Sequence, residues 1–125
     1  MTVRDLKSQL DGWPADLTVL VSYPSRITDM SKAFGSIMPE LEGSPASGNF
    51  VHVVVKDERP TPLANASGQT VGELRAALDA WPEGAEVLVK YPDFRDRTPF
   101  LLGQLVDELR RASDDSRLVL LVVRE

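Results

Sequence analysis

The chain has 125 residues, of which 42% are hydrophobic and 26% are charged, and its formal net charge is −5. This composition is typical of a globular domain and excludes a disordered chain, while the negative charge argues against nucleic-acid binding, which depends on Lys and Arg. With no cysteine, the chain can form neither disulfides nor zinc–thiolate sites. The apolar runs are too short to span a membrane, no signal peptide is visible and cysteine is absent, so we expect a cytoplasmic protein.

A segment near the N-terminus is repeated later in the chain. Residues 2–24 and 70–92 are identical at twelve of 23 positions, and the 68-residue offset continues to the C-terminus without a gap. Such self-similarity indicates a tandem duplication. The copies are separated by a segment with two prolines and several small polar residues, which is typical of a surface connector. We therefore expect a single compact domain over 1–125, made of repeat 1 (2–57), a connector (58–69) and repeat 2 (70–125).

Each repeat is expected to open with an α-helix. Thr70 is a favourable N-cap, and Glu73 follows three residues later, as in a capping box. Apolar residues then recur at helical spacing, and a proline after the last of them ends the helix. The apolar positions in the two copies are Val3, Leu6, Leu10 and Trp13, and Val71, Leu74, Leu78 and Trp81.

Valine-rich strands are expected after each helix, over 17–23 and 85–91, and at the end of each repeat, over 50–56 and 118–124. The last of these is apolar on both faces, which indicates a central position in a sheet.

The middle of each repeat allows two interpretations. Apolar spacing and the segment after Pro99 favour a helix, whereas Pro39 would interrupt the equivalent helix of repeat 1. We favour strands over 33–38 and 101–106. The predicted fold class is α+β, with two tandem pseudo-twofold repeats that each contain a helix and a three-stranded antiparallel meander. The alternative repeat is helix–strand–helix–strand with parallel pairing.

The segment TVGELRAALDAWPEGAEVLVKYP (70–92) resembles the opening of a set of small, uncharacterised proteins from bacteria, especially actinobacteria, and their phages. Repeat 1 departs from this pattern at Arg4 and Asp5. The resemblance rests on the helix cap, the apolar helix face and the proline that ends the helix. It implies a shared fold and a phage or mobile-element context, and it assigns no catalytic residue.

The loops after the first strand of each repeat are the candidate binding site. They follow equivalent strands, and a pseudo-twofold axis would bring them into related positions. Tyrosine and arginine are favoured in binding sites, and arginine can bind phosphate or carboxylate groups. A structural interpretation also holds, in which the arginines pair with neighbouring aspartates. The candidate ligand- or partner-binding residues are Tyr23, Arg26, Tyr91, Asp93, Phe94, Arg95 and Arg97.

The sequence indicates no enzymatic activity. It has a single histidine, His52, in a valine-rich strand, and it contains no nucleophile motif or glycine-rich phosphate loop. We expect no catalytic residue, no metal site and no cofactor. The favoured function is a non-enzymatic protein-binding or assembly module that engages a protein partner or a second copy of itself. The alternative is a protein that sequesters a small anionic ligand or nucleotide between the two Tyr-Pro loops.

Overall fold

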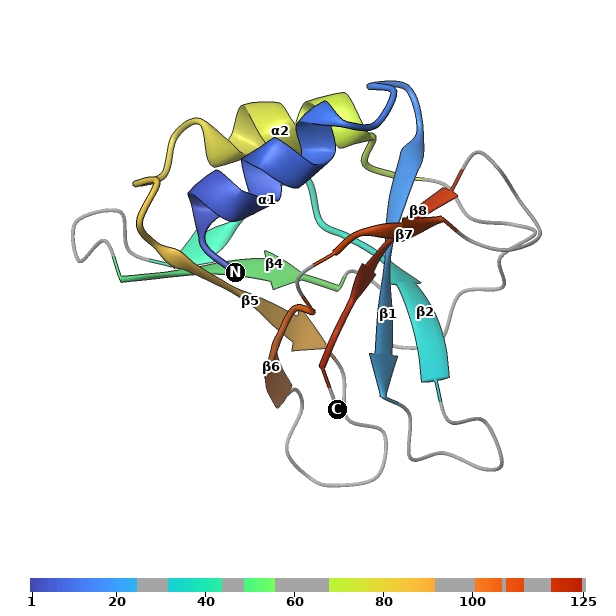
Figure 1. The fold of residues 1–125 in the computed structure, drawn as a ribbon. Helices are drawn as coiled ribbons and strands as arrows, with labels where there is room; N and C mark the ends of the chain where they lie inside the picture. Colours follow the sequence, from blue (N-terminus) through green and yellow to red (C-terminus); the bar gives the residue numbers. More distant parts are fainter. Residues whose placement is uncertain are drawn as a thin grey trace.

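The structure is a computed structural model that describes residues 1–24, 32–43, 49–55, 68–91, 101–106, 108–111 and 118–124. In these residues the chain forms an α+β fold, with two helices above two β-sheets (Figure 1). Neither described helix has the length and apolar character needed to cross a lipid bilayer.

The helices α1 (Val3–Asp11) and α2 (Val71–Leu78) both begin with the expected capping box. In α2 the Thr70 hydroxyl oxygen accepts a hydrogen bond from the Glu73 amide, and the Glu73 carboxylate accepts one from the Thr70 amide, each at 3.2 Å. Thr2 and Asp5 make the same exchange in α1. The helices end earlier than the position of the proline predicted, at Asp11 and Leu78. Trp13 and Trp81 therefore lie in the turns that follow, where they pack against the core. The buried helix face consists of Val3, Leu6, Leu10, Val71, Leu74 and Leu78.

The described strands form two four-stranded sheets, and each sheet combines strands from both halves of the sequence. Sheet 1 has the order β2-β1-β8-β7, with β1 (Thr18–Pro24), β2 (Lys32–Ser36), β7 (Arg110–Arg111) and β8 (Leu118–Val122). Sheet 2 has the order β3-β4-β5-β6, with β3 (Glu42–Gly43), β4 (Phe50–Val54), β5 (Glu86–Tyr91) and β6 (Leu101–Gln104). In each sheet the two central strands are parallel and the outer pairs are antiparallel.

Strands, and not helices, occupy the ambiguous middle segments, as the favoured interpretation predicted for 33–38 and 101–106. The expected meander within each repeat is wrong, because the first and last strands of each half lie in different sheets. The chain changes sheet directly after β2, where Ile37 pairs with Val55 of sheet 2. The physical reason is that β4 and β8 are apolar and take a parallel partner from the other half, which gives each of them a neighbour on both sides.

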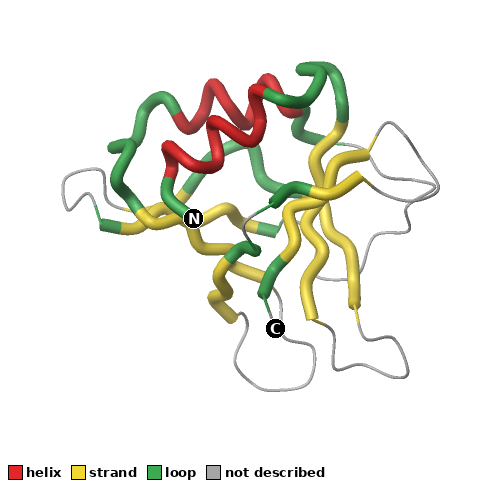
Figure 2. The backbone as a smooth tube through the Cα atoms, in the orientation of Figure 1, coloured by secondary structure: helices red, strands yellow, loops and turns green. Residues whose placement is uncertain are grey.

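The main core lies between the two sheets and beneath the helices, and it draws side chains from all of these elements. Figure 2 shows the helices on one side of the molecule and the strands of the two sheets running in different directions below them. Tyr23 and Tyr91 meet in this core, with ring centroids 5.4 Å apart and planes inclined by 29°. The ends of β1 and β5 therefore lie next to each other.

The contacts between the two halves recur at the 68-residue offset seen in the sequence. The Val3 amide donates to the Ala85 carbonyl, and the Val71 amide donates to the Leu17 carbonyl, both at 2.8 Å. Ion pairs between the helices follow the same rule: Lys7 contacts Asp79, Arg75 contacts Asp11, and both distances are 2.6 Å. The helix of each half is therefore held by a hydrogen bond at its start and by an ion pair to the other half.

Candidate functional site

The tyrosines of the predicted site come together, but inside the core. Tyr23 is 1% exposed and Tyr91 is 8% exposed, so their rings offer little surface to a ligand. The other predicted binding residues, Arg26, Asp93, Phe94, Arg95 and Arg97, lie outside the described residues. Their role stays a prediction, and the structure adds that the strands leading to both loops end side by side.

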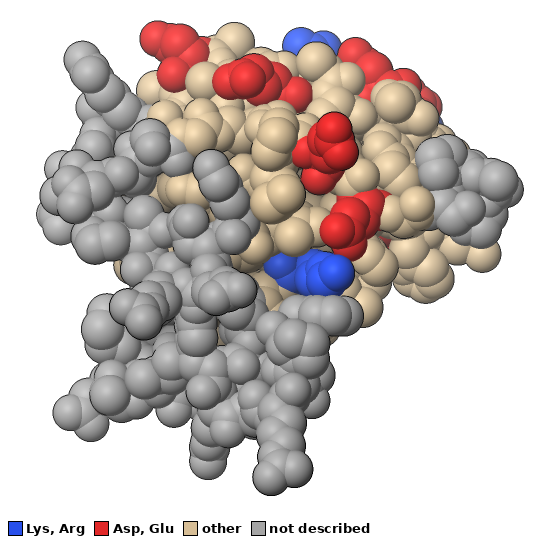
Figure 3. All heavy atoms as spheres, turned by 180° about the vertical axis from the view of Figure 1, so that it is seen from behind, with Lys and Arg blue, Asp and Glu red and all other residues tan. Residues whose placement is uncertain are grey.

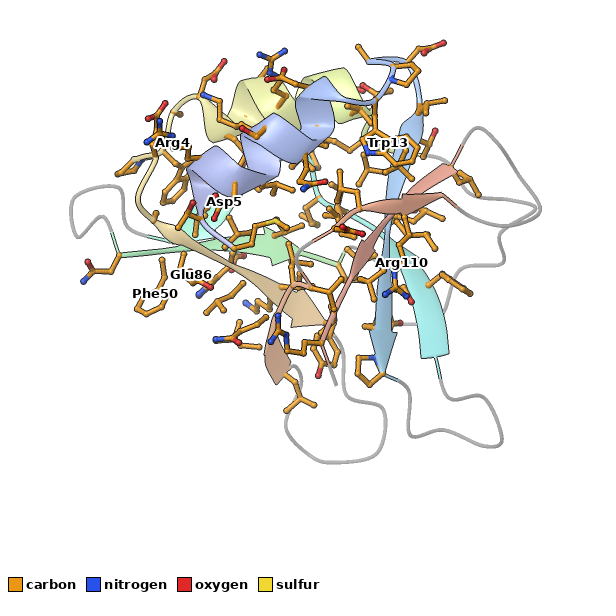
Figure 4. All side chains as sticks on the ribbon, in the orientation of Figure 1. Arg4, Asp5, Trp13, Phe50, Glu86 and Arg110 are labelled. Atoms are coloured by element: carbon orange, nitrogen blue, oxygen red, sulfur yellow. The ribbon has the colours of Figure 1, made fainter. Side chains whose placement is uncertain are left out.

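The largest exposed apolar side chains of the described residues gather elsewhere, on the outer side of sheet 2. Phe50 is 51% exposed, Leu102 is 47% exposed and Met38 is 40% exposed. Along β4 and β5 the side chains alternate, so that one set enters the core and the other points away from it. Phe50 belongs to the outward set, and Figure 4 shows it with Glu86 on β4 and β5, away from α1.

Strand register places these apolar residues on one surface. Leu102 of β6 is paired with Lys90 of β5, and Lys90 is paired with Val54 of β4. Met38 joins them, because its amide donates to the Val54 carbonyl at 2.8 Å while the preceding Ile37 is buried in the core. We call this surface the open face. Its residues are the apolar Met38, Phe50, Val54, Leu88 and Leu102 and the polar Glu42, His52, Glu86, Lys90 and Gln104, which the same register places on this surface.

The charges on and beside the open face are paired within the molecule. The Lys90 ammonium group contacts Glu42 at 3.1 Å, reaching across β4 because β3 and β5 flank that strand. Glu86 contacts the N-terminal amine of Met1 at 3.0 Å. Figure 3 shows acidic side chains spread over the described surface from behind, with a basic patch lying against an acidic one. The open face thus mixes exposed apolar side chains with polar ones, and its Lys90 and Glu86 charges are paired within the molecule.

The equivalent face of sheet 1 is closed. Leu118 stands 68 residues after Phe50 and is 3% exposed, and Leu20 stands 68 residues before Leu88 and is fully buried. The two leucines form a small apolar cluster separate from the main core. Part of their surroundings is the segment that leads into α2, since Gly68 lies against Ser36 of β2. The equivalent positions are therefore buried on sheet 1 and partly exposed on sheet 2, where His52, Lys90 and Gln104 replace Leu120, Ser22 and Ser36.

A second feature is a cleft of about 270 Å³ beside the helices, lined by Trp13 and by the ion pair of Arg75 with Asp11. Its lining includes the small residues Ala15, Gly72 and Ala76. The residues at the equivalent positions of the other half are Glu83, Arg4 and Ser8. The cleft is also lined by Asp79, so its wall carries two carboxylates and one guanidinium group, of which Asp11 pairs with Arg75 and Asp79 pairs with Lys7 outside the lining. Another cleft of about 350 Å³ lies beside α1, lined by Met1, Asp5, Ser8 and Gln9.

The described residues contain no group of three or more His, Asp or Glu side chains arranged to hold a metal ion. His52, the single histidine of the sequence, is half-buried on β4, where its cross-strand neighbours are Glu42 and Leu88. Fold and site together define an α+β protein with interleaved halves and with large apolar side chains exposed on one sheet face.

No protein-family model and no solved structure match the chain. The chain is 32% identical over 123 residues to the protein-glutamate methylesterase/protein-glutamine glutaminase 1 of Chromobacterium violaceum. This match covers 89% of the chain and 33% of the relative, so the chain spans about a third of the length of that protein.

Proposed function

We propose that the chain is a non-enzymatic module that binds a protein partner through the open face of sheet 2. The observation that carries the proposal is the gathering of Met38, Phe50 and Leu102, the large exposed apolar residues of the described chain, on one sheet surface. Large apolar side chains exposed together on one face are costly in water and are characteristic of interaction sites. Aromatic and Met side chains are also enriched at interfaces.

We propose that the two halves are related by a pseudo-twofold axis and form a single domain. We also propose that the protein originates from actinobacteria or from a phage.

The interleaved halves support the binding function by making the face rigid. The central strands of sheet 2 come from different halves and pair in parallel over five residue pairs, from Phe50 with Glu86 to Val54 with Lys90. Because a rigid surface loses little conformational entropy on binding, a modest apolar area can give useful affinity.

A photo-crosslinking amino acid at position 50 tests the proposal. We expect irradiation in cells to join the chain to one defined protein, either another protein or a second copy, which mass spectrometry identifies and purified components reproduce. The same amino acid at Ala80, an exposed residue beyond the end of α2, is the control and should give no such product. Equal labelling from both positions, or none from position 50, would refute the open face as a binding site.

A second candidate function follows from the tyrosine pair. Since β1 and β5 end beside each other, the loops that carry Arg26, Arg95 and Arg97 start from neighbouring points. We propose on this basis that they bind one small anionic ligand, such as a nucleotide, through arginine–phosphate contacts. A raised thermal midpoint with nucleotides, lost in an Arg95→Ala/Arg97→Ala variant, is the expected result. A midpoint unchanged by nucleotides would contradict it.

The methylesterase and glutaminase activities named for the Chromobacterium protein are not part of the proposal. The similarity covers a third of that protein, and the single histidine lies between Glu42 and Leu88 on a strand, not beside a described serine nucleophile.

A further inference from the structure

We infer that the interface between the two halves is self-complementary, so that at high protein concentration each half can bind the like half of a second copy. Within one chain, residues 2–57 pack against residues 70–125. In the exchanged form, which we call the like-half dimer, two copies of 2–57 form one folded unit and two copies of 70–125 form the other. Exchange of identical elements between copies is a low-cost route to a dimer. This inference does not depend on the open face.

The hydrogen bonds between the halves are made by the backbone and occur twice. The Val3 amide donates to the Ala85 carbonyl, and the Val71 amide donates to the Leu17 carbonyl, 68 residues away in each case. The parallel pairs of β1 with β8 and of β4 with β5 also have equivalent registers, each over five residue pairs. Each half therefore carries both the donors and the acceptors of the interface, and a like half offers the same set.

The ion pairs between the helices follow the same rule. Lys7 of α1 contacts Asp79 of α2, and Arg75 of α2 contacts Asp11 of α1. Each helix thus supplies one cation and one anion, at positions that are equivalent in the two halves. In the like-half dimer, Lys7 would face Asp11 of the second copy, and Arg75 would face Asp79 of the second copy. Both arrangements keep opposite charges in contact.

The buried side chains at the interface are largely interchangeable. Eleven pairs of main-core residues are related by the 68-residue offset, and eight of them are identical, including the stacked Tyr23 and Tyr91. The three pairs that differ are Leu17 with Ala85, Ile37 with Leu105, and Val53 with Leu121. In 70–125 the smaller Ala85 accompanies the larger Leu121, so the total volume stays similar. Cores tolerate apolar exchanges that keep volume and pattern.

Covalent linkage selects the arrangement within one chain at low concentration. Residues 58–69 join the halves in the sequence, and a short linker holds two binding modules at an effective concentration in the millimolar range. A like-half dimer replaces the two folded units of two monomers with two equivalent units. We therefore expect it to be populated only as the protein concentration approaches that range.

Charge reversal in one half tests the inference in the full chain. In Lys7→Glu/Asp11→Lys, both ion pairs between the helices of one chain become contacts between like charges, whereas like halves of two copies still present opposite charges. The reversed order also suits α1, with the acid nearer its start and the base nearer its end. Because four contacts change sign per dimer, the dissociation constant should fall by about tenfold or more. Sedimentation velocity after refolding from urea, from micromolar to millimolar protein, measures it.

Two matched variants serve as controls. Arg75→Glu/Asp79→Lys reverses the other half and should strengthen the dimer equally, so it repeats the test if the first variant fails to fold by circular dichroism. All four substitutions together restore opposite charges within one chain and should return the dissociation constant to that of the parent. Because the contacts are exposed, high salt should reduce the difference between parent and double variants.

Exchange between unlike halves of two copies is distinguished by the same variants. It would bring together the same like charges as the single chain, so charge reversal in one half would not strengthen it. A dissociation constant unchanged in both double variants would overturn the inference, as would one that stays lowered when all four substitutions are combined. Double variants that remain monomeric at millimolar protein, or that fold at no concentration, would also overturn it. Crosslinking from position 50 tests the open face separately and is unaffected by these outcomes.

Discussion

Gly103 packs directly against Val123, so that a Cβ added to the glycine would be 2.6 Å from Cγ1 of the valine. Tyr91 covers the same position at 3.0 Å. Sixty-eight residues earlier, Gly35 has the same relation to Val55, at 2.5 Å. Gly35 lies on β2, an outer strand of sheet 1, and Val55 follows β4 of sheet 2. Gly103 lies on β6, an outer strand of sheet 2, and Val123 follows β8 of sheet 1. In both places the missing side chain of the glycine lets the valine approach closely from the other sheet.

We expect Gly103→Ala to destabilise the protein by about 1–3 kcal/mol, the usual cost of overpacking a filled core. Val123 is 2% exposed and cannot move into solvent to make room. Urea denaturation measures the change. Gly84→Ala is the matched control, because its added Cβ meets no described atom within 4 Å. A Gly103→Ala chain as stable as that control would show that the close approach is not a constraint.

The capping box of α2 gives a second prediction. Thr70→Ala removes the hydroxyl that accepts from the Glu73 amide and should cost about 1 kcal/mol, since the amide loses its partner at the helix start. Thr70→Ser keeps an acceptor in the same place and should retain most of the stability. Thermal denaturation of both variants provides the comparison. Equal losses in the two variants would attribute the effect to the threonine methyl group.

The ion pair of Lys7 with Asp79 predicts how stability depends on pH. The hydrogen bond and the positive charge of Lys7 lower the pKa of Asp79 below its ordinary value of 3.8. A lowered folded-state pKa means that the stabilisation is fully present above pH 3.8 and is lost as the pH falls through the folded-state pKa. We expect Lys7→Met to be slightly less stable than the parent at neutral pH and equal to it in stronger acid.

Urea midpoints of the parent and of Lys7→Met across this pH range are the measurement. Lys7→Arg preserves the charge pair and should follow the parent. The Asp79 side chain is 64% exposed. The stability difference between the parent and Lys7→Met should therefore be small, and it should decrease further in high salt. A constant difference between parent and Lys7→Met at all pH values would exclude titration of Asp79 as its source.

Local patterns predicted the local structure well. Thr70, Glu73 and the apolar spacing define α2, because capping and helix amphipathicity are properties of a single segment. Pairing between strands could not be predicted in the same way. Val53 and Leu121 are apolar residues on strands that fit either half equally well, and only the three-dimensional structure shows that β4 pairs with β5 and β8 with β1.

The open face could not have been found from the sequence. Phe50 and Leu118 occupy equivalent positions and are both apolar, yet one is half-exposed and the other is buried. Exposure here depends on what lies over each sheet, a long-range property that neither residue type nor spacing records. The predicted loop site shows the reverse: residue chemistry singled out Tyr23 and Tyr91 as binding groups, and their apolar rings instead stack in the core.

The interleaving of the halves predicts that neither half folds as a stable monomer. In a chain of residues 1–57, β1 would lack β8 and β4 would lack β5, which exposes apolar strand edges and the buried faces of Val51 and Val53. Unpaired edges of this kind favour association with another chain. We expect 1–57 and 68–125 to be unfolded or self-associated when expressed separately.

When co-expressed, the two fragments should form a folded 1:1 complex with the circular dichroism spectrum of the intact protein. Leu74→Ala in the second fragment creates a core cavity and should weaken the complex, whereas Ala80→Ser should not. A monomeric fragment with a cooperative thermal transition would refute the exchange of strands between halves.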